Sequence, residues 1–506
     1  MSTQHSNRRE FMGAMAASSG ALFLNACSGK SDTPAPAASS APAVPFKPKR
    51  VFLLTMDTVR MDHLGCYGYP RITSPFMDSL AESGLRFRES LCACSNTLPS
   101  HVSLFSGLQI EQHGLHHNGY LAIHPDVYML PQLFSDAGYK TGSFTSVVWM
   151  NLMGQGFDHH DGYNEKYVQD NSTTRYYRKA DETFRQCTDW VESLSPDDDF
   201  FTWIHVYDPH NPFYPPEDLF TEFTQDFERR PDELFQYWMQ DQKKTLHCHE
   251  YDGKRSKLAE MHNYYDAEIR FVDRELERLY KAAEAKGLLE DSLWIITTDH
   301  GEGMGQHEYW GHGMHIYDEQ MLSPFIMHTP GGQYGPRVVQ ETIHHIDLLP
   351  TMASILEQPL PDIPLTRTGH NLHGLLTDPK HQLPPRNHYY QRRKRKSSGF
   401  TQDWEEGPIV GLKGDTHTVI HHRNGQHEVY NNEQDPHQLE NLFAKNLPEG
   451  NALLKEAEAQ YALFDKEAEA VHGVRSDDAP QDAVPFLEEL EALGYIGGDG
   501  QAEDVE

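Results

Sequence analysis

The sequence predicts an α/β protein with a doubly wound, mostly parallel sheet and a smaller C-terminal subdomain of antiparallel strands and helices. Three observations lead to this prediction. Short apolar runs alternate with segments of helical periodicity, as in chains whose strands are buried between two layers of helices. Polar residues of chemical interest follow the ends of these runs, where parallel sheets form their sites. After about residue 385 the chain changes to short strands separated by tight turns.

The elements of the large region follow in order along the chain. Continuous apolar runs predict buried strands, which cover residues 51–56, 141–149, 199–207, 293–298 and 323–329. Apolar residues at helical spacing predict helices, which cover residues 72–86, 97–108, 132–140 and 257–285. The helix that begins at Thr97 carries Pro99 in its first turn, where proline is tolerated. We therefore expect one large domain over residues 49–385.

A smaller subdomain is expected over residues 386–506. Within it, residues 408–430 are expected to form short strands, and the turn at Arg423-Asn424-Gly425 predicts a hairpin because Asn-Gly accepts left-handed backbone. A second turn is predicted at Lys413-Gly414-Asp415. The basic run from Gln391 to Lys396 is expected to be a solvated loop, and contact with an anionic substrate or a lipid headgroup is the alternative.

The first 27 residues are expected to be an export signal and are excluded from the fold. Arg8-Arg9 precedes a mild apolar run, which resembles a twin-arginine signal, and Leu24-Asn25-Ala26-Cys27 resembles a bacterial lipobox. A linker rich in Pro, Ala and Ser follows over residues 28–48. We expect an exported lipoprotein of the periplasm or cell envelope that meets the membrane only through a lipid on Cys27. A plain N-terminal tail is the alternative.

The charge excludes one class of partner. The 506 residues contain 43 Lys and Arg against 75 Asp and Glu, which gives a formal net charge of −32. Because nucleic-acid binding needs a basic surface, no nucleic acid is expected as a partner. The six cysteines include no pair with the CxxC spacing of a metal site.

Asp57, Asp299 and His300 are candidate metal ligands because they follow the ends of predicted strands. Carboxylate oxygens and an imidazole at neighbouring strand ends can converge on one divalent cation. Thr97 begins a predicted helix, and its hydroxyl on the same cation would lose its proton more readily. Asp57 and Thr97 could instead be helix caps, so the prediction depends on the whole set occurring in this order.

A second group of candidates comes from segments rich in histidine. HVYDPHNPF supplies His205, Asp208 and His210, and TTDHGEGMGQHEYWGHG supplies His312. Histidine titrates near neutral pH, which suits proton transfer to or from a reacting group. His205 lies inside a predicted strand and could instead be a hydrogen-bonded core residue.

These motifs, in this order, resemble the sulfatase family of the alkaline phosphatase superfamily. The resemblance covers roughly residues 49–500 and rests on MDTVRMDHLGCYG, TLPSHVSLFSG, DPHNPF, TTDHGEGMGQHE, HHIDLLPTM and EVYNNEQDPHQLENL. It implies an alkaline-phosphatase-like α/β domain followed by a smaller one. It also implies hydrolysis of a sulfate ester or, in some branches, of a phosphate or phosphonate ester with a divalent metal.

The chain departs from the sulfatase pattern at the nucleophile. Sulfatases carry Cys or Ser, within Cys-x-Pro-Ser-Arg, where this chain has Thr97, and His101 replaces the arginine. The family oxidises that residue to formylglycine, but threonine cannot give an aldehyde because its β-carbon carries a methyl group. No formylglycine is therefore expected. Thr58 stands where sulfatases have a second aspartate.

Threonine nucleophiles occur elsewhere in the same superfamily, in nucleotide pyrophosphatases and lipid-headgroup phosphotransferases. The resemblance therefore implies a metal-dependent hydrolase in which Thr97 attacks sulfur or phosphorus, and it shifts the expectation toward phosphorus esters. One divalent ion is expected, held by Asp57, Thr97, Asp299 and His300. Ca²⁺ is the expected ion, and Zn²⁺ or Mn²⁺ fits nearly as well.

The remaining roles also follow from the resemblance. Binding of the transferring oxygens or protonation of the leaving group is expected of His101, His210 and His312, and His205 and Asp208 are expected to orient His210. The expected substrate is a sulfate or phosphate mono- or diester of a small molecule or glycan, selected by insertions over residues 213–255 and 385–405. The alternatives are a phosphodiesterase or headgroup phosphotransferase, and a non-catalytic binding protein that retains the fold.

Overall fold

The fold is described from a computed structural model, which describes residues 46–118, 123–124, 126–163, 177–238, 255–392 and 408–472. The expected signal and the linker up to residue 45 lie outside these residues, as do residues 393–407 with most of the basic run. The residues from Phe46 onward belong to one compact unit. None of the helices in the described part is both long and apolar enough to cross a membrane.

The centre of the molecule is an eight-stranded sheet with the order β12-β2-β11-β7-β1-β6-β4-β5. Five neighbouring strands are parallel, namely β7 (Ser292–Thr298), β1 (Arg50–Met56), β6 (Phe200–Val206), β4 (Lys140–Thr145) and β5 (His159–Asp161). On the other side of β7 the sheet continues with the antiparallel β11 (Phe325–His328), then β2 (Leu85–Phe87) and β12 (Arg337–Val339). The doubly wound, mostly parallel sheet is therefore confirmed.

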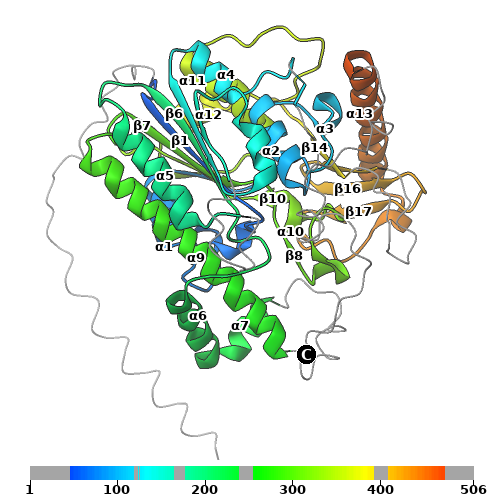
Figure 1. The fold of residues 1–506 in the computed structure, drawn as a ribbon. Coiled ribbons are helices and arrows are strands. Elements are labelled where there is room, and N and C mark those ends of the chain that lie inside the picture. The colour runs from blue at the N-terminus through cyan, green and yellow to red at the C-terminus, as the bar shows by residue number, and fades with distance from the viewer. Residues whose placement is uncertain are drawn as a thin grey trace, which may run out of the picture. The chain divides into compact units, whose positions relative to one another are not determined.

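Helices cover both faces of this sheet (Figure 1). One face carries α1 (Pro75–Ser83), α5 (Ala180–Ser193) and α9 (Arg255–Ala285), and the other carries α2 (Thr97–Ser106), α4 (Leu130–Asp136), α11 (Leu348–Leu356) and α12 (His373–Thr377). The alternation along β1 explains this arrangement, because Val51 and Leu53 enter one core and Phe52, Leu54 and Met56 enter the other. All seven residues of β1 are buried, as its continuous apolar run predicts.

Two predicted strands differ in detail from the observed ones. The strand expected over 141–149 ends at Thr145, and a 3₁₀ helix, η3 (Val148–Gly154), follows it. Trp149, Met150 and Met153 are buried in the core from this helix, so their apolar character reflects packing rather than strand structure. The segment expected as one strand over 323–329 divides at Pro324 into β10 (Leu322–Ser323) and β11.

Small sheets surround the edge at which the parallel strands end. They are β10-β3-β13, with β3 (Ser90–Leu91) and β13 (Ile343–His344), and the hairpin of β8 (Gly303–Met304) and β9 (Trp310–Gly311). Short helices in the same region are α3 (Ile110–His113) and α10 (Asp318–Met321).

The C-terminal region is an antiparallel sheet covered by one long helix. Its strands are β14 (His388–Arg392), β15 (Ile409–Lys413), β16 (His417–His422) and β17 (Glu428–Asn431), and both predicted turns join neighbouring strands. Helix α13 (Pro448–His472), which the sequence prediction omitted, packs on β15 and β16. A shared core cluster, including Met321 and Tyr390, joins this sheet to α10. The boundary at residue 385 stays a prediction.

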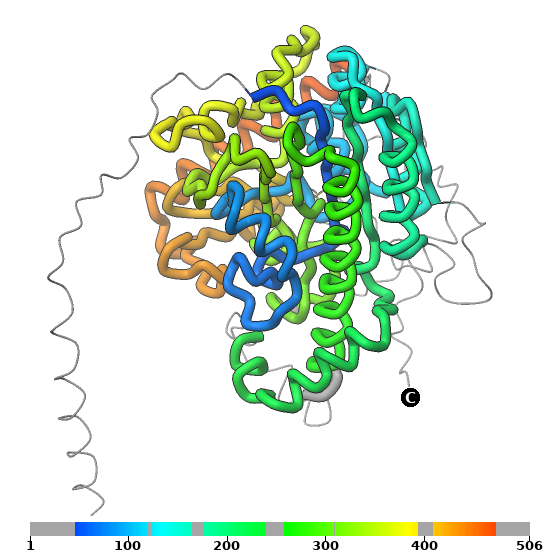
Figure 2. The backbone as a smooth tube through the Cα atoms, turned by 90° about the vertical axis from the view of Figure 1, so that its left-hand side faces the viewer, coloured from blue at the N-terminus to red at the C-terminus, as the bar shows by residue number. Residues whose placement is uncertain are grey.

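Helices α6 (Glu217–Arg229) and α7 (Pro231–Trp238) lie beside the N-terminal end of α9 (Figure 2). A buried group of paired charges, the Arg71–Asp266 hub, joins them to the loop after β1. The Asp266 carboxylate accepts hydrogen bonds from Arg71 Nη1 at 2.8 Å and Tyr69 OH at 2.7 Å, and His63 Nδ1 lies 2.8 Å from it. Arg71 also pairs with Asp226 at 3.1 Å. Each charge in the hub thus faces an opposite charge or a donor.

Candidate active site

The candidate metal ligands meet at the carboxyl ends of β1 and β7. The register pairs Met56 with Thr298, so the next residues, Asp57 and Asp299, leave the sheet at the same level. One ligand atom from each of Asp57, Asp299 and His300 lies within 4.8 Å of the other two. All three side chains are fully buried. The structure thus brings together the predicted carboxylates and histidine from positions about 240 residues apart in the sequence.

The protonation of His300 suits a metal ligand. Its Nδ1 lies 2.9 Å from the carbonyl oxygen of Gly301, which fixes a proton on Nδ1 and leaves the Nε2 lone pair available. Nε2 lies 3.3 Å from Asp299 Oδ2, and neither atom has a hydrogen-bond partner among the described residues. A divalent cation would satisfy both buried atoms, so these residues fit the metal that the sequence predicts.

The two carboxyl groups differ in their electrostatic surroundings. Burial and then the charge of Asp299 raise the pKa of Asp57, His300 opposes them, and Glu302 raises the pKa slightly further against the Thr97 hydroxyl. For Asp299, burial is outweighed by neighbouring histidines and by hydrogen bonds, and the pKa is lowered. Its Oδ1 accepts from the backbone N–H groups of His300 at 2.9 Å and Thr58 at 3.1 Å. Two adjacent buried carboxyl groups, one with a raised and one with a lowered pKa, repel each other when both are ionised, so a bound cation would stabilise them.

Thr97 is held beside this cluster by the first turn of α2. Asn96 precedes the helix in extended conformation, and Ser100 N–H donates to the Asn96 carbonyl at 3.0 Å. The Ser100 hydroxyl donates to the carbonyl oxygen of Asp299 at 2.7 Å, which ties the helix to the end of β7. The Thr97 side chain is buried and interacts with the Asp57 carboxyl. The predicted nucleophile therefore lies at the predicted metal site.

His101 uses both of its ring nitrogens within the protein. His101 Nδ1 donates to the Thr97 carbonyl oxygen at 2.8 Å, because a carbonyl oxygen can only accept. In the neutral ring Nε2 therefore accepts from the Thr55 hydroxyl at 2.9 Å, and Thr55 Oγ1 accepts from Trp203 Nε1, also at 2.9 Å. Burial lowers the pKa of His101 to about 3, which keeps the ring neutral. These contacts favour a role for His101 in positioning Thr97 over the expected contact with the transferring oxygens.

His210 and His312 face each other next to the metal ligands. Their ring centroids are 4.9 Å apart, and the His312 ring is 4.6 Å from that of His300. His312 Nδ1 lies 3.2 Å from Glu302 Oε2, and Tyr207 OH lies 3.3 Å from His210 Nε2. Burial, and then the neighbouring His312, lower the pKa of His210. The predicted histidine pair therefore converges on the same site.

The two residues expected to orient His210 have other neighbours. Asp208 Oδ1 accepts the backbone N–H of Ala180 at 3.0 Å, at the start of α5, and its Oδ2 has no hydrogen-bond partner among the described residues. His205 Nε2 lies 3.4 Å from Asp57 Oδ2. His205 therefore lies beside a candidate metal ligand, and the expectation that both residues orient His210 stays a prediction.

Sequence reasoning missed several residues of the site. Thr55 was hidden within the apolar run VFLLTM, although a polar residue in a buried strand is itself a signal for a hydrogen-bond partner. Glu302 follows His300 by two positions, and a further acidic residue so close to Asp299 is a signal that it belongs to the same site. Trp203 carries no comparable signal, because its contact depends on the packing of α2 against the sheet, whereas Ser100 occupies the serine position of the Cys-x-Pro-Ser-Arg pattern.

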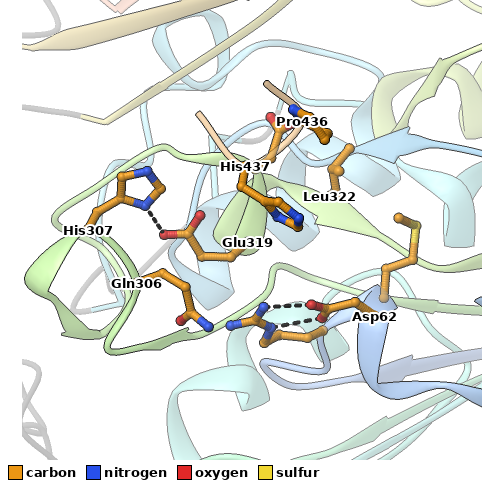
Figure 3. A pocket seen from close by; sticks show the side chains of 10 residues that line it. Asp62, Gln306, His307, Glu319, Leu322, Pro436 and His437 are labelled. Carbon is orange, nitrogen blue, oxygen red and sulfur yellow. Dashed lines mark hydrogen bonds and ion pairs between the residues drawn. The ribbon is translucent and has the colours of Figure 1, made fainter. Parts of the chain in front are cut away.

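A small cavity lies between the histidine-rich loop and the C-terminal region (Figure 3). It has a volume of about 170 Å³, and its walls include two ion pairs, Arg60–Asp62 and His307–Glu319. Burial opposes the charge on His307, but Glu319 outweighs it and raises the pKa of the imidazole. His307 Nε2 also lies 3.1 Å from the Gln438 carbonyl oxygen. The cavity is thus lined by ion pairs of the large domain, and His307 joins its wall to the C-terminal region.

Comparison with known proteins agrees with this geometry. A family model described as Sulfatase matches residues 49–358. A protein of Escherichia coli described as an uncharacterized sulfatase is 25% identical over 440 residues, which cover 78% of this chain and 83% of its own length.

Solved structures share the fold at low sequence identity. A structure described as a complex with its substrate, D-glucosamine-2-N,6-O-disulfate, has a TM-score of 0.64 at 19% identity and covers 86% of this chain and 100% of its own. The phosphonate monoester hydrolase of Agrobacterium radiobacter has a TM-score of 0.64 at 18% identity, with 83% and 96% covered.

Proposed function

The chain belongs to the sulfatase family, and from this premise we propose that it hydrolyses a sulfate or phosphate ester with the Thr97 hydroxyl as nucleophile. The observation that carries the proposal is the position of Thr97 at the start of α2, where its side chain meets the buried cluster of Asp57, Asp299 and His300. A helix cap would not require its hydroxyl to meet a buried carboxyl that itself belongs to a candidate metal site.

The reaction can be written from the residues present. The Thr97 oxygen attacks sulfur or phosphorus, and the bond to the oxygen of the departing alcohol breaks. The Thr97 proton passes to the neighbouring Asp57 carboxylate, and the alcohol oxygen takes a proton from the His210–His312 pair. Water then attacks the esterified threonine, returns one proton to the histidine pair and releases sulfate or phosphate, while the Thr97 oxygen takes its proton back from Asp57.

Asp57, Asp299 and His300 would hold the divalent ion, with the Thr97 oxygen beside it. When bound, such an ion lowers the pKa of a contacting hydroxyl and offsets the charge that develops on the transferring oxygens. Ca²⁺ is the expected ion because two ligands are carboxylates, and the His300 nitrogen keeps Zn²⁺ and Mn²⁺ as alternatives. Elemental analysis of the purified chain distinguishes the three.

The choice between sulfur and phosphorus depends on the second half of the reaction. An unmodified threonine ester must be cleaved by water, as in phosphoryl transfer through a covalent intermediate. The fold is shared both with the complex of a sulfated glucosamine and with a phosphonate monoester hydrolase. We therefore propose a sulfate or phosphorus ester of a small molecule or glycan, and a phosphodiesterase is the second candidate.

A substrate panel tests the proposal. Purified chain is assayed on an aryl sulfate, an aryl phosphate monoester, an aryl phosphodiester and an aryl phosphonate, each with and without EDTA. We expect turnover of at least one ester and its loss with EDTA. No turnover of any ester, together with no bound metal by elemental analysis, would contradict the proposed hydrolase.

Matched variants of Thr97 test the nucleophile. Thr97→Ala removes the hydroxyl and is expected to abolish turnover, whereas Thr97→Ser keeps it and is expected to retain part of the activity. Mass spectrometry after an acid quench is expected to find the sulfate or phosphate adduct on residue 97 only when a hydroxyl is present. Full activity of Thr97→Ala would show that another group attacks.

Export and lipid attachment are a separate part of the proposal, supported by Arg8-Arg9 and Leu24-Asn25-Ala26-Cys27. Labelling of the expressed chain with radioactive palmitate is expected to mark the wild-type chain and not Cys27→Ala. Equal labelling of the two would contradict attachment at Cys27.

A further inference from the structure

Thr58 has an unusual backbone conformation next to a metal ligand. Its φ angle is +57°, in the left-handed region that β-branched residues rarely adopt. It follows Asp57 directly, at the end of β1, and its side chain is fully buried. Such conformations persist where surrounding contacts determine them, and they concentrate at functional sites.

Each polar group of Thr58 has a partner from a different part of the fold. The backbone N–H donates to Asp299 Oδ1 at 3.1 Å, and the carbonyl oxygen accepts from Tyr265 OH, on α9, at 2.7 Å. The hydroxyl donates toward two carbonyl oxygens, that of Asp57 at 2.8 Å and that of Pro209 at 3.1 Å.

The contact with Pro209 connects two halves of the site. Pro209 immediately precedes His210, whose ring faces His312 beside the metal ligands. The hydroxyl of Thr58 is therefore a direct side-chain link between the strand that carries Asp57 and the loop that carries His210. The backbone of the same residue fixes Asp299.

We propose that Thr58 is a positioning residue whose hydroxyl fixes the Asp208-Pro209-His210 loop against the end of β1, so that His210 faces the reaction centre. The inference rests on the proposed function, because His210 is its proton donor. The backbone N–H to Asp299 is independent of the side chain, so a substitution at residue 58 that keeps the backbone leaves that metal ligand in place.

The test uses side chains of matched size. Thr58→Val keeps the shape and removes the hydroxyl, and Thr58→Ser keeps the hydroxyl and removes a methyl group. We expect Thr58→Val to lower kcat about fivefold to tenfold with little change in metal affinity, the scale of one lost hydrogen bond, and Thr58→Ser to restore it. Thr73→Val is the control, because Thr73 is also buried and donates to a carbonyl oxygen, that of His63, away from the site. It is expected to lower stability and leave kcat unchanged.

A double-mutant cycle shows whether the effect passes through His210. In a His210→Ala background, Thr58→Val is expected to lower kcat no further, because the ring it positions is gone. Additive losses, or a kcat for Thr58→Val equal to wild type, would overturn the inference while leaving the hydrolase proposal intact.

A binding measurement separates the two proposals if turnover is absent. Titration calorimetry with inorganic sulfate and inorganic phosphate is performed on the metal-loaded full chain and on both Thr58 variants. Weaker anion binding in Thr58→Val, restored in Thr58→Ser, supports the positioning role without reference to activity. Equal binding by all three chains, or no binding by any of them, contradicts it.

Discussion

Two buried polar regions of the molecule, the Arg71–Asp266 hub and the reaction centre around Asp57 and Asp299, both adjoin the loop after β1. They differ in how their charges are paired. In the Arg71–Asp266 hub, cationic and anionic groups face each other at 2.8–3.1 Å. At the reaction centre, the carboxyls of Asp57 and Asp299 face each other, and buried atoms of Asp299 and His300 have no hydrogen-bond partner among the described residues. The difference separates a structural network from a site whose charge distribution suits a bound cation.

The comparison assigns different costs to the two regions. Breaking a complete buried pair leaves an uncompensated charge and destabilises the fold. Removing one of two facing carboxyls relieves repulsion and removes function instead. Substitutions in the hub should therefore lower the free energy of unfolding and leave kcat unchanged. Substitutions at the reaction centre should lower kcat and leave the free energy of unfolding nearly unchanged.

The largest expected effect comes from Asp57→Asn. We expect kcat/KM to fall at least about a thousandfold, roughly 4 kcal/mol in the barrier, because a metal ligand is lost. The melting temperature of the metal-free variant is expected to equal or exceed that of the metal-free parent, since the facing carboxyl is gone. Calorimetry in EDTA checks this, and a clear fall in melting temperature would mean that the centre also carries structural stability.

Arg71→Met tests the other side of the comparison. It removes the guanidinium that pairs with Asp266 and Asp226 in the hub. The free energy of unfolding, measured by urea denaturation, should fall by about 3–5 kcal/mol. Activity per folded molecule is expected to stay at the parental value. A selective loss of kcat with unchanged stability would show that the hub reaches the chemistry.

Chelation sharpens the comparison without a mutation. A ligand present at 100 times its dissociation constant stabilises the folded chain by about 2.7 kcal/mol, so EDTA should lower the melting temperature by several degrees. The same treatment of Asp57→Asn should produce little or no shift, and Arg71→Met should respond like the parent. An equal shift in all three chains would place the ion elsewhere.

The smallest expected effect is the pH dependence of the His307–Glu319 pair. Because folding raises the pKa of His307, the stability that His307 contributes is complete below pH 6.5 and is lost as the pH rises through the pKa of the folded state. Because folding lowers the pKa of Glu319, the stability that Glu319 contributes is present above pH 4.5 and is lost as the pH falls. The stability difference between parent and His307→Gln, about 1.5 kcal/mol, should therefore be largest between pH 4.5 and 6.5. A difference that grows above pH 7 would contradict this ion pair.

The sequence was sufficient where a single local pattern determines the structure. The strand at 51–56, the helix at 257–285 and the turn at Asn424-Gly425 follow from periodicity and turn chemistry, and the structure confirms them. The gathering of Asp57, Thr97, Asp299 and His300 followed from their positions after strands and at a helix start.

What the sequence did not supply depends on contacts between distant segments. The relay from Trp203 through Thr55 to His101 requires the register of β1 against β6, which no local pattern encodes. The left-handed backbone of Thr58 was equally hidden, because threonine has no preference for that region. The helix at Pro448–His472 was missed although it packs a regular apolar face.

The pairing of β1 with β7 has a consequence for biosynthesis. Thr58 and Asp299 are hydrogen bonded across 241 positions, so a chain emerging from the ribosome carries Asp57 and Thr97 long before their partners exist. Contacts of such sequence separation form late, because a long loop must close before they stabilise the fold. We therefore expect the proposed ion to bind among the last events of folding, after the central sheet is complete.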